Sequence, residues 1–270
     1  MPISRRTPQN APVTGGAYNY NYNYTNINTP LWLRLLSLET PPPILLVGPP
    51  GLGKTFWINN VFSRYKIPVI QIAVAVALEE DFSGIPIDKE KKTMNNDEEI
   101  TIIRKAIPKW LYKVKVANQK GISPVLFFDE INTTHHRIMS CMLKLIHEQE
   151  FDAEIPFKAR IVAACNYPED NGGIELTPAL INRFCIFELH KDDFVKCFID
   201  DCLPNIIPAT KYMNVSTYVR PFLRLNEHLA QIERVPKELK TYENFPTLRG
   251  WAKIIEYGDY CKDYNELFTF

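Results

Sequence analysis

A chain of 270 residues, 46% of them hydrophobic, is long enough to bury a sizeable core and suggests one large domain or a core with a smaller second domain. Its 31 basic and 31 acidic residues balance, so no global field favours nucleic acid or an anionic membrane, although a local basic channel would not show in that sum. No apolar run approaches the ~20 residues that span a bilayer. The N-terminal residues also lack the apolar core of a secretory signal.

The six cysteines form no C-x-x-C pair, and several stand inside apolar segments, as Cys165 does. Buried free thiols are typical of proteins in a reducing compartment. We therefore expect a cytoplasmic protein that does not act at a membrane.

Residues 1–29 have the composition of a tail. Tyrosine and asparagine alternate from Tyr18 to Tyr24, which makes this segment low in complexity. Such a segment could pair as an edge strand or mediate self-association. The pattern favours a mobile N-terminal tail over either alternative.

From residue 30 to about residue 190, short apolar runs alternate with helical patterns. The runs predict strands at Ile44–Val47, Val69–Val76, Val125–Phe128, Arg160–Ala164 and Cys185–Leu189. The patterns between them predict helices at about Lys54–Tyr65, Asp97–Gln119, Thr134–Glu148 and Pro178–Asn182. Buried strands that alternate with helices indicate an α/β fold with a parallel sheet covered on both faces.

After about residue 191 the strand signal disappears. Helical patterns at Asp192–Leu203, Val215–Glu233 and Thr247–Tyr260 are separated by prolines. We expect a smaller, all-helical domain over residues 191–270.

A phosphate-binding loop follows the first predicted strand. Its residues are Gly48-Pro49-Pro50-Gly51-Leu52-Gly53-Lys54-Thr55, which fit the pattern G-x-x-x-x-G-K-[ST] between a strand and a helix. Glycines let backbone N–H groups point at a polyphosphate, and the following helix adds its positive N-terminal end. Lys54 would reach the β- and γ-phosphates, and the Thr55 hydroxyl would ligate Mg²⁺. A glycine-rich turn that binds nothing is the alternative, and the Lys-Thr pair argues against it.

Polar residues end two further predicted strands. The apolar run Val125–Phe128 delivers Asp129, expected to hold Mg²⁺ opposite Thr55, and Glu130, expected to orient or deprotonate the attacking water. Either acid alone could be a solvated strand end. Asn166 follows the run Arg160–Ala164 and could donate to the γ-phosphate or position water, although an asparagine here could also be a turn residue.

This order of motifs resembles the AAA+ ATPases over roughly residues 30–260. The resemblance implies a three-layer αβα nucleotide-binding core at residues 30–190, a helical lid at 191–270, and the role called sensor 1 for Asn166. It identifies Leu176–Phe184 with the family's arginine-finger segment, so Arg183 would reach the nucleotide of the neighbouring subunit. A salt bridge within its own subunit is the alternative role for Arg183.

The segment Phe245–Trp251 resembles the family's sensor 2, which would place Arg249 on the γ-phosphate of its own subunit. The commoner spelling there is Ser-Pro-Arg, whereas this chain has Thr247-Leu248-Arg249. The alternative is an exposed arginine at a helix start.

Three segments are similar to the MoxR-like branch of the family. They are Glu80–Pro86, Asp129–Asn132 and the expected short hairpin at Glu150–Phe157. This resemblance implies a homo-oligomeric ring, expected as a hexamer, that hydrolyses ATP with Mg²⁺ and remodels a protein client in a chaperone role. Partners that carry a von Willebrand A domain are common in that branch.

The chief alternative is an AAA+ motor or loader that acts on DNA or RNA. Such a motor needs Lys, Arg and aromatic residues on loops that face the pore. The expected hairpin at residues 150–158 has three acids and one lysine, which favours a protein client. A nucleotide switch with little hydrolysis would lack the base or the finger, but Glu130 and Arg183 are both present.

Overall fold

The structure, a computed structural model, describes residues 30–93, 99–151, 155–167, 170, 174–199, 215–231 and 246–257. The tail predicted for residues 1–29 lies outside these ranges.

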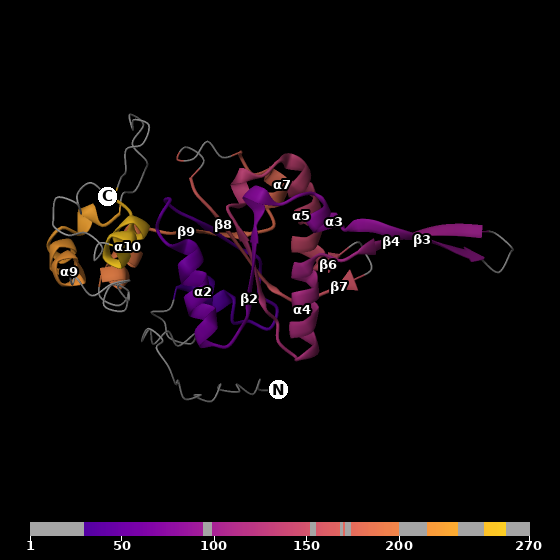
Figure 1. Ribbon diagram of the computed structural model, residues 1–270, viewed down its shortest axis with the longest axis horizontal. Helices are drawn as coiled ribbons and strands as arrows, with labels where there is room; N and C mark the ends of the chain where they lie inside the picture. The colour runs from indigo at the N-terminus through magenta and orange to yellow at the C-terminus, as the bar shows by residue number, and fades with distance from the viewer. Residues whose placement is uncertain are drawn as a thin grey trace, which may run out of the picture.

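Five parallel strands form the central sheet, in the order β2-β5-β8-β1-β9 (Figure 1). The strands are β1 (Ile44–Val47), β2 (Val69–Ala73), β5 (Val125–Asp129), β8 (Arg160–Cys165) and β9 (Cys185–Glu188). Each overlaps one of the five predicted strands, and only β2 is clearly shorter, because a 3₁₀ turn at Val74–Val76 follows it. Since all neighbours are parallel, the carboxyl ends of the five strands lie at one edge of the sheet.

Helices cover both faces of this sheet. Successive strand residues enter different buried clusters: Val125 and Phe127 pack in one, and Leu126 and Phe128 in the other. The first cluster is covered by α1 (Leu31–Leu35) and α2 (Lys54–Arg64), and the second by α4 (Lys109–Gln119), α5 (His136–Glu148) and α7 (Pro178–Ile181). The fold is therefore the predicted three-layer αβα arrangement.

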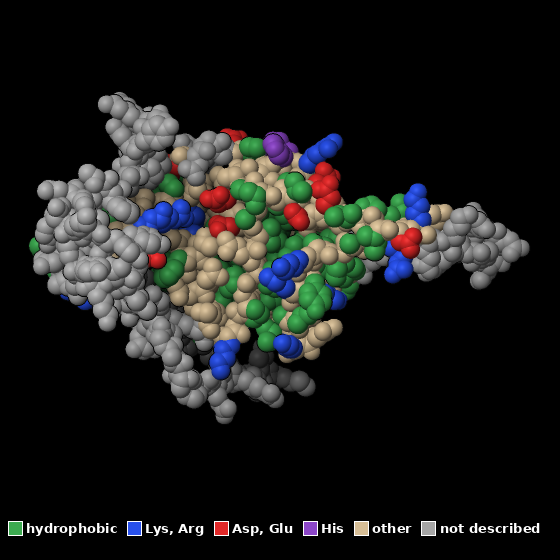
Figure 2. All heavy atoms as spheres, viewed as in Figure 1, with side chains coloured by type: hydrophobic (Ala, Val, Ile, Leu, Met, Phe, Trp, Pro, Cys, Tyr) green, Lys and Arg blue, Asp and Glu red, His purple; other side chains and the backbone are tan. Residues whose placement is uncertain are grey.

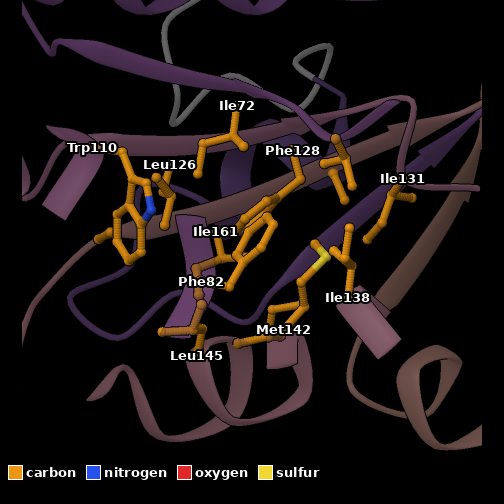
Figure 3. Packing of buried hydrophobic residues seen from close by; sticks show 14 of the residues in the cluster. Ile72, Phe82, Trp110, Leu126, Phe128, Ile131, Ile138, Met142, Leu145 and Ile161 are labelled. Atoms are coloured by element: carbon orange, nitrogen blue, oxygen red, sulfur yellow. The ribbon is translucent and has the colours of Figure 1, made fainter. Parts of the chain in front are cut away.

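Figure 3 shows the second cluster, where Leu126 and Phe128 of β5 meet Met142 and Leu145 of α5 and Trp110 of α4. Leu126, Phe128 and Met142 are fully buried. Burial of side chains of this size stabilises a fold by about 1.5–3 kcal/mol each. The packing fixes β5 on both faces and therefore holds the strand end that carries Asp129.

The predicted helix at residues 97–119 is wrong in its first half. Residues Glu99–Ala106 form β4, which pairs antiparallel with β3 (Ile85–Thr93), and α4 begins only after Pro108. The run Ile100–Ile103 is β-branched throughout, which suits a strand. Pro108 disfavours helix in the residue before it but suits the start of the helix after it.

The hairpin of β3 and β4 projects from the core (Figure 1). The run of four charged residues Lys89–Lys92 lies within β3. In Figure 2 the hairpin carries hydrophobic side chains nearer the core and basic and acidic ones farther from it. Ile85, Ile87 and Ile103 of the hairpin are exposed.

The short hairpin predicted at Glu150–Phe157 is present as β6 (Glu150–Phe151) and β7 (Ile155–Pro156), which pair antiparallel. Two short helical elements complete this part of the core: α3 (Glu80–Ser83) before β3, and a 3₁₀ turn at Ile131–Thr133 after β5.

Beyond β9, the elements of the described residues are helical. They are α8 (Lys191–Cys197), α9 (Val215–Leu225), a 3₁₀ turn at Glu227–Leu229 and α10 (Leu248–Tyr257). Side chains of α9 and α10 share a buried cluster with α2 and β1, and Phe194 of α8 meets Trp57 of α2 with ring centres 5.1 Å apart. Because this cluster is continuous, the boundary near residue 190 stays a prediction. Within the described ranges, no helix has the length and apolar character needed to cross a membrane.

Candidate nucleotide site

The loop at residues 48–53 joins β1 to α2 and needs glycine at two positions. Gly51 and Gly53 have φ angles of 73° and 87°, in the left-handed region that L side chains rarely adopt. At Gly51 a Cβ atom would also lie 2.6 Å from Cβ of Thr247, so the loop and the start of α10 can approach this closely only at a glycine. Gly53 directly precedes the first residue of α2, which is Lys54.

Lys54 is held at the centre of the site by three acceptors. Its Nζ donates to the carbonyl oxygens of Gly48 at 2.9 Å and Pro49 at 3.0 Å, and to Oδ1 of Asn166 at 2.7 Å. Burial lowers the pKa of Lys54 from 10.5 to about 8, an effect that nearby groups such as Asp129 partly oppose. The ammonium is therefore already oriented toward the loop by hydrogen bonds that a bound anion could replace.

Thr55 and Asp129 meet across the gap between α2 and β5. The Thr55 hydroxyl donates to Oδ2 of Asp129 at 2.7 Å, and Gln71 Nε2 donates to the same oxygen at 2.9 Å. Hydroxyl and carboxylate oxygens are the hard ligands that Mg²⁺ prefers, so this pair fits the ion. Sequence reasoning missed Gln71, because a single polar residue in an edge strand is usually exposed to solvent.

Glu130 follows Asp129 in a left-handed conformation, with a φ angle of 55°. For a residue other than glycine this conformation costs energy and is concentrated at functional sites. The Thr133 hydroxyl donates to the Glu130 carbonyl oxygen at 2.7 Å and braces the turn. The Glu130 side chain stays exposed, as a residue that meets substrate must be.

Asn166 lies at the end of β8 and is buried, with 6% of its surface exposed. Besides its contact with Lys54, its backbone carbonyl accepts from Asn132 Nδ2 at 3.2 Å. Asn132 is also buried, and its Oδ1 has no hydrogen-bond partner among the described residues. Asn132 therefore ties the turn after β5 to the end of β8.

These residues enclose a small cavity of about 120 Å³. Its lining residues are Pro50, Gly51, Gly53, Lys54, Thr55, Asp129, Glu130, Ala164, Cys165, Asn166 and Arg249. Pockets that hold whole ligands usually measure about 300–1,000 Å³, so the enclosed part suits phosphate groups rather than an entire nucleotide. Burial raises the pKa of the Cys165 thiol to about 11, which leaves it protonated and neutral beside Lys54.

A larger groove of about 1,030 Å³ lies between α2, β2 and α4, with Lys66, Lys113 and Lys120 among its lining residues. Asp129, Glu130 and Asn166 do not line it. Size alone would favour this groove as the ligand-binding site, but the convergent polar groups lie in the smaller cavity.

The two predicted arginines occupy different positions. Arg249 lines the cavity from the first turn of α10, and its backbone N–H donates to the Gly51 carbonyl oxygen at 3.2 Å. Arg183 is outside the lining and lies just after α7, where its Nη1 donates to the carbonyl oxygen of Ala179 at 2.7 Å. Within one chain, Arg249 lines the same cavity as the other predicted site residues, whereas Arg183 does not.

Comparison with known proteins agrees with this geometry. Residues 44–189, just over half of the chain, match the model of the ATPase family associated with various cellular activities (AAA). A crystal structure of a presumed ATPase from Cytophaga hutchinsonii is 21% identical and matches over 55% of this chain and 42% of its own, with a TM-score of 0.34. That similarity is too low to add to the argument. Among curated proteins no sequence matches. The chain belongs to the AAA family of ATPases.

Proposed function

We propose that this ATPase binds the phosphates of ATP in the cavity between the phosphate loop, β5, β8 and α10. The observation that carries the proposal is the chain of hydrogen bonds at the carboxyl edge of the sheet. Lys54 contacts Asn166, and Thr55 contacts Asp129, although each pair is far apart in sequence. Ligands of parallel sheets bind at this edge.

Each group has a role that follows from its chemistry. Lys54 exchanges its carbonyl acceptors for phosphate oxygens, since a charged hydrogen bond to phosphate is stronger than one to a neutral carbonyl. Asn166 accepts from Lys54 in the absence of nucleotide, and its amide N–H group can donate to the γ-phosphate or to water. Arg249 adds positive charge from α10.

Thr55 and Asp129 would hold Mg²⁺. When bound, the ion neutralises charge on the β- and γ-phosphates. Gln71 keeps the Asp129 carboxylate turned toward Thr55 by donating to the oxygen that also accepts from the Thr55 hydroxyl.

Glu130 acts as general base. Its exposed carboxylate follows the proposed Mg²⁺ ligand Asp129 directly and is free to accept a proton from the attacking water. The strained turn that carries it supports this role, because such strain is tolerated where the surrounding structure holds a functional group in place.

Arg183 completes the site of a neighbouring subunit. Its position after α7, outside the cavity of its own chain, supports a role in trans. A guanidinium that works only across an interface requires an assembly of subunits, and we infer a hexameric ring of the MoxR-like branch.

The work of the ring is the remodelling of a protein client, with a von Willebrand A domain protein as the expected partner. The balanced charge of the chain, together with the three acids and one lysine of residues 150–158, supports a protein client over nucleic acid. A motor on DNA or RNA is the second candidate.

The test of the client is capture with Glu130→Gln, which retains ATP without rapid turnover. Protein enriched with this variant in ATP, and lost with Lys54→Ala, supports a protein client. If the retained material is nucleic acid, sensitive to nuclease and to salt, the motor is the correct alternative.

A further inference from the structure

Two consecutive residues of the phosphate loop, Pro50 and Gly51, contact the helical region that follows β9. The Gly51 carbonyl oxygen accepts from the Arg249 N–H at 3.2 Å, and Cα of Gly51 faces the Thr247 side chain so closely that no Cβ would fit. The Pro50 carbonyl oxygen accepts from Gln231 Nε2 at 3.1 Å. Pro50 and Gly51 thus use their backbone oxygens on the helical region, which leaves the Gly51 N–H for phosphate.

Gln231 also contacts α10 directly. Its Oε1 accepts from the N–H of Leu248, the first residue of α10, at 3.1 Å. The first amides of a helix lack partners within the helix and need an acceptor from outside. One glutamine amide therefore joins the phosphate loop at one end to the helix that carries Arg249 at the other.

The bridge is buried. Gln231 has 0% of its surface exposed, and Ala230 and Leu248 beside it are also buried. A buried amide whose partner moves away is left unsatisfied at a cost in free energy, because water cannot take the partner's place. The loop and the start of α10 therefore tend to keep their relative position, and a shift of the Pro50 peptide is passed to Leu248.

We propose that Gln231 is the positioning residue that couples phosphate binding in the loop to the placement of α10 and its Arg249. Phosphate that binds the loop N–H groups fixes the peptides of Pro50 and Gly51, and Gln231 transmits this order to the first turn of α10. Coupling of this kind is a difference in free energy between two sites, so it is measurable without hydrolysis. It rests on the nucleotide site proposed above.

The experiment is hydrogen exchange of the full chain with and without a non-hydrolysable ATP analogue and Mg²⁺. In the unmodified protein we expect the analogue to slow exchange at residues 48–55 and also, by about fivefold or more, at α10. Gln231→Met removes both hydrogen bonds at similar volume, and we expect the loop to remain protected while α10 responds less than about twofold. Gln231→Glu keeps the acceptor for Leu248 but sets an oxygen against the Pro50 carbonyl, so it gives the same loss even if Gln231→Met does not fold.

Trp251→Phe is the matched control. It removes the hydrogen bond from Trp251 Nε1 to the Leu229 carbonyl oxygen, 2.9 Å long, which stays within the helical region and does not reach the loop. We expect this variant to retain the full response of α10. If the loop is protected but α10 responds equally in the Gln231 variants, or fails to respond in the unmodified protein, the coupling is overturned. Absence of protection at residues 48–55 would instead overturn the proposed site.

Discussion

The cavity around Lys54 and the segment after α7 that carries Arg183 differ in how much a single chain supplies. Around Lys54, side chains from α2, β5, β8 and α10 converge, and several contact one another. Arg183 contacts only its own helix backbone in the hydrogen bond that the structure gives it, and it does not reach the cavity. From this difference we propose that one chain suffices to bind ATP, whereas hydrolysis needs a second.

The largest effect that tests the comparison is loss of binding in Lys54→Ala. Its ammonium is held between loop carbonyls and Asn166, and each charged hydrogen bond is worth about 1.5–3 kcal/mol. We expect no measurable ATP binding by calorimetry. Lys113→Ala, which changes the larger groove instead, serves as control and should bind normally. Unchanged affinity in Lys54→Ala would remove the cavity as the binding site.

Dilution separates binding from hydrolysis. If Arg183 acts in trans, the ATPase rate per subunit should fall by about tenfold or more below the concentration at which the protein assembles, while ATP affinity stays nearly constant. Turnover and sedimentation measured over the same concentration series check this. A rate per subunit that stays flat through dissociation would show that the site is complete within one chain.

The Mg²⁺ requirement tests whether Thr55 in the cavity is a ligand of the ion. Thr55→Val keeps the shape of the side chain but removes the hydroxyl that donates to Asp129. One lost ligand should raise the Mg²⁺ concentration for half-maximal activity by about tenfold, a difference of about 1.4 kcal/mol. Thr55→Ser, which retains the hydroxyl, should restore the value. Equal Mg²⁺ requirements in all three proteins would argue against Thr55 as a ligand.

The smallest predicted effect comes from the pKa of Lys54, which burial lowers to about 8. Phosphate favours the protonated form, so ATP affinity should fall as pH rises through 8, by about fourfold between pH 7 and 8.5. The free energy of unfolding changes in the opposite direction and increases with pH. The unfolded chain keeps the Lys54 proton up to pH 10.5, so the cost of burying the charged side chain is full below pH 8 and is relieved as pH rises to 10.5. Calorimetry in buffers of different ionisation enthalpy should detect proton uptake near pH 8, and its absence would contradict the lowered pKa.

The sequence predicted the sheet well because its strands contain short apolar runs, of which Ile44–Val47 and Val125–Phe128 are apolar throughout. It predicted the loop because that pattern leaves few alternatives. The helix predicted at residues 97–119 failed because the pairing of β4 with the distant β3 overrides the local pattern. Gln71 and Gln231 were missed for a related reason. Their partners, Asp129 and Pro50, are 58 and 181 positions away, and only the folded chain brings them together.

The most direct test of the account mixes two inactive variants. Arg183→Ala subunits keep Glu130, and Glu130→Gln subunits keep Arg183, so only a mixed ring contains interfaces with both groups intact. A general base contributes about 10²–10⁴-fold, and an arginine finger about 10³–10⁵-fold, so each variant alone should bind ATP but hydrolyse almost none. We expect mixtures to regain activity in proportion to the number of mixed interfaces. If mixed rings form, as judged by co-purification of differently tagged subunits, and activity stays at the level of the single variants, Arg183 does not act on the neighbouring site.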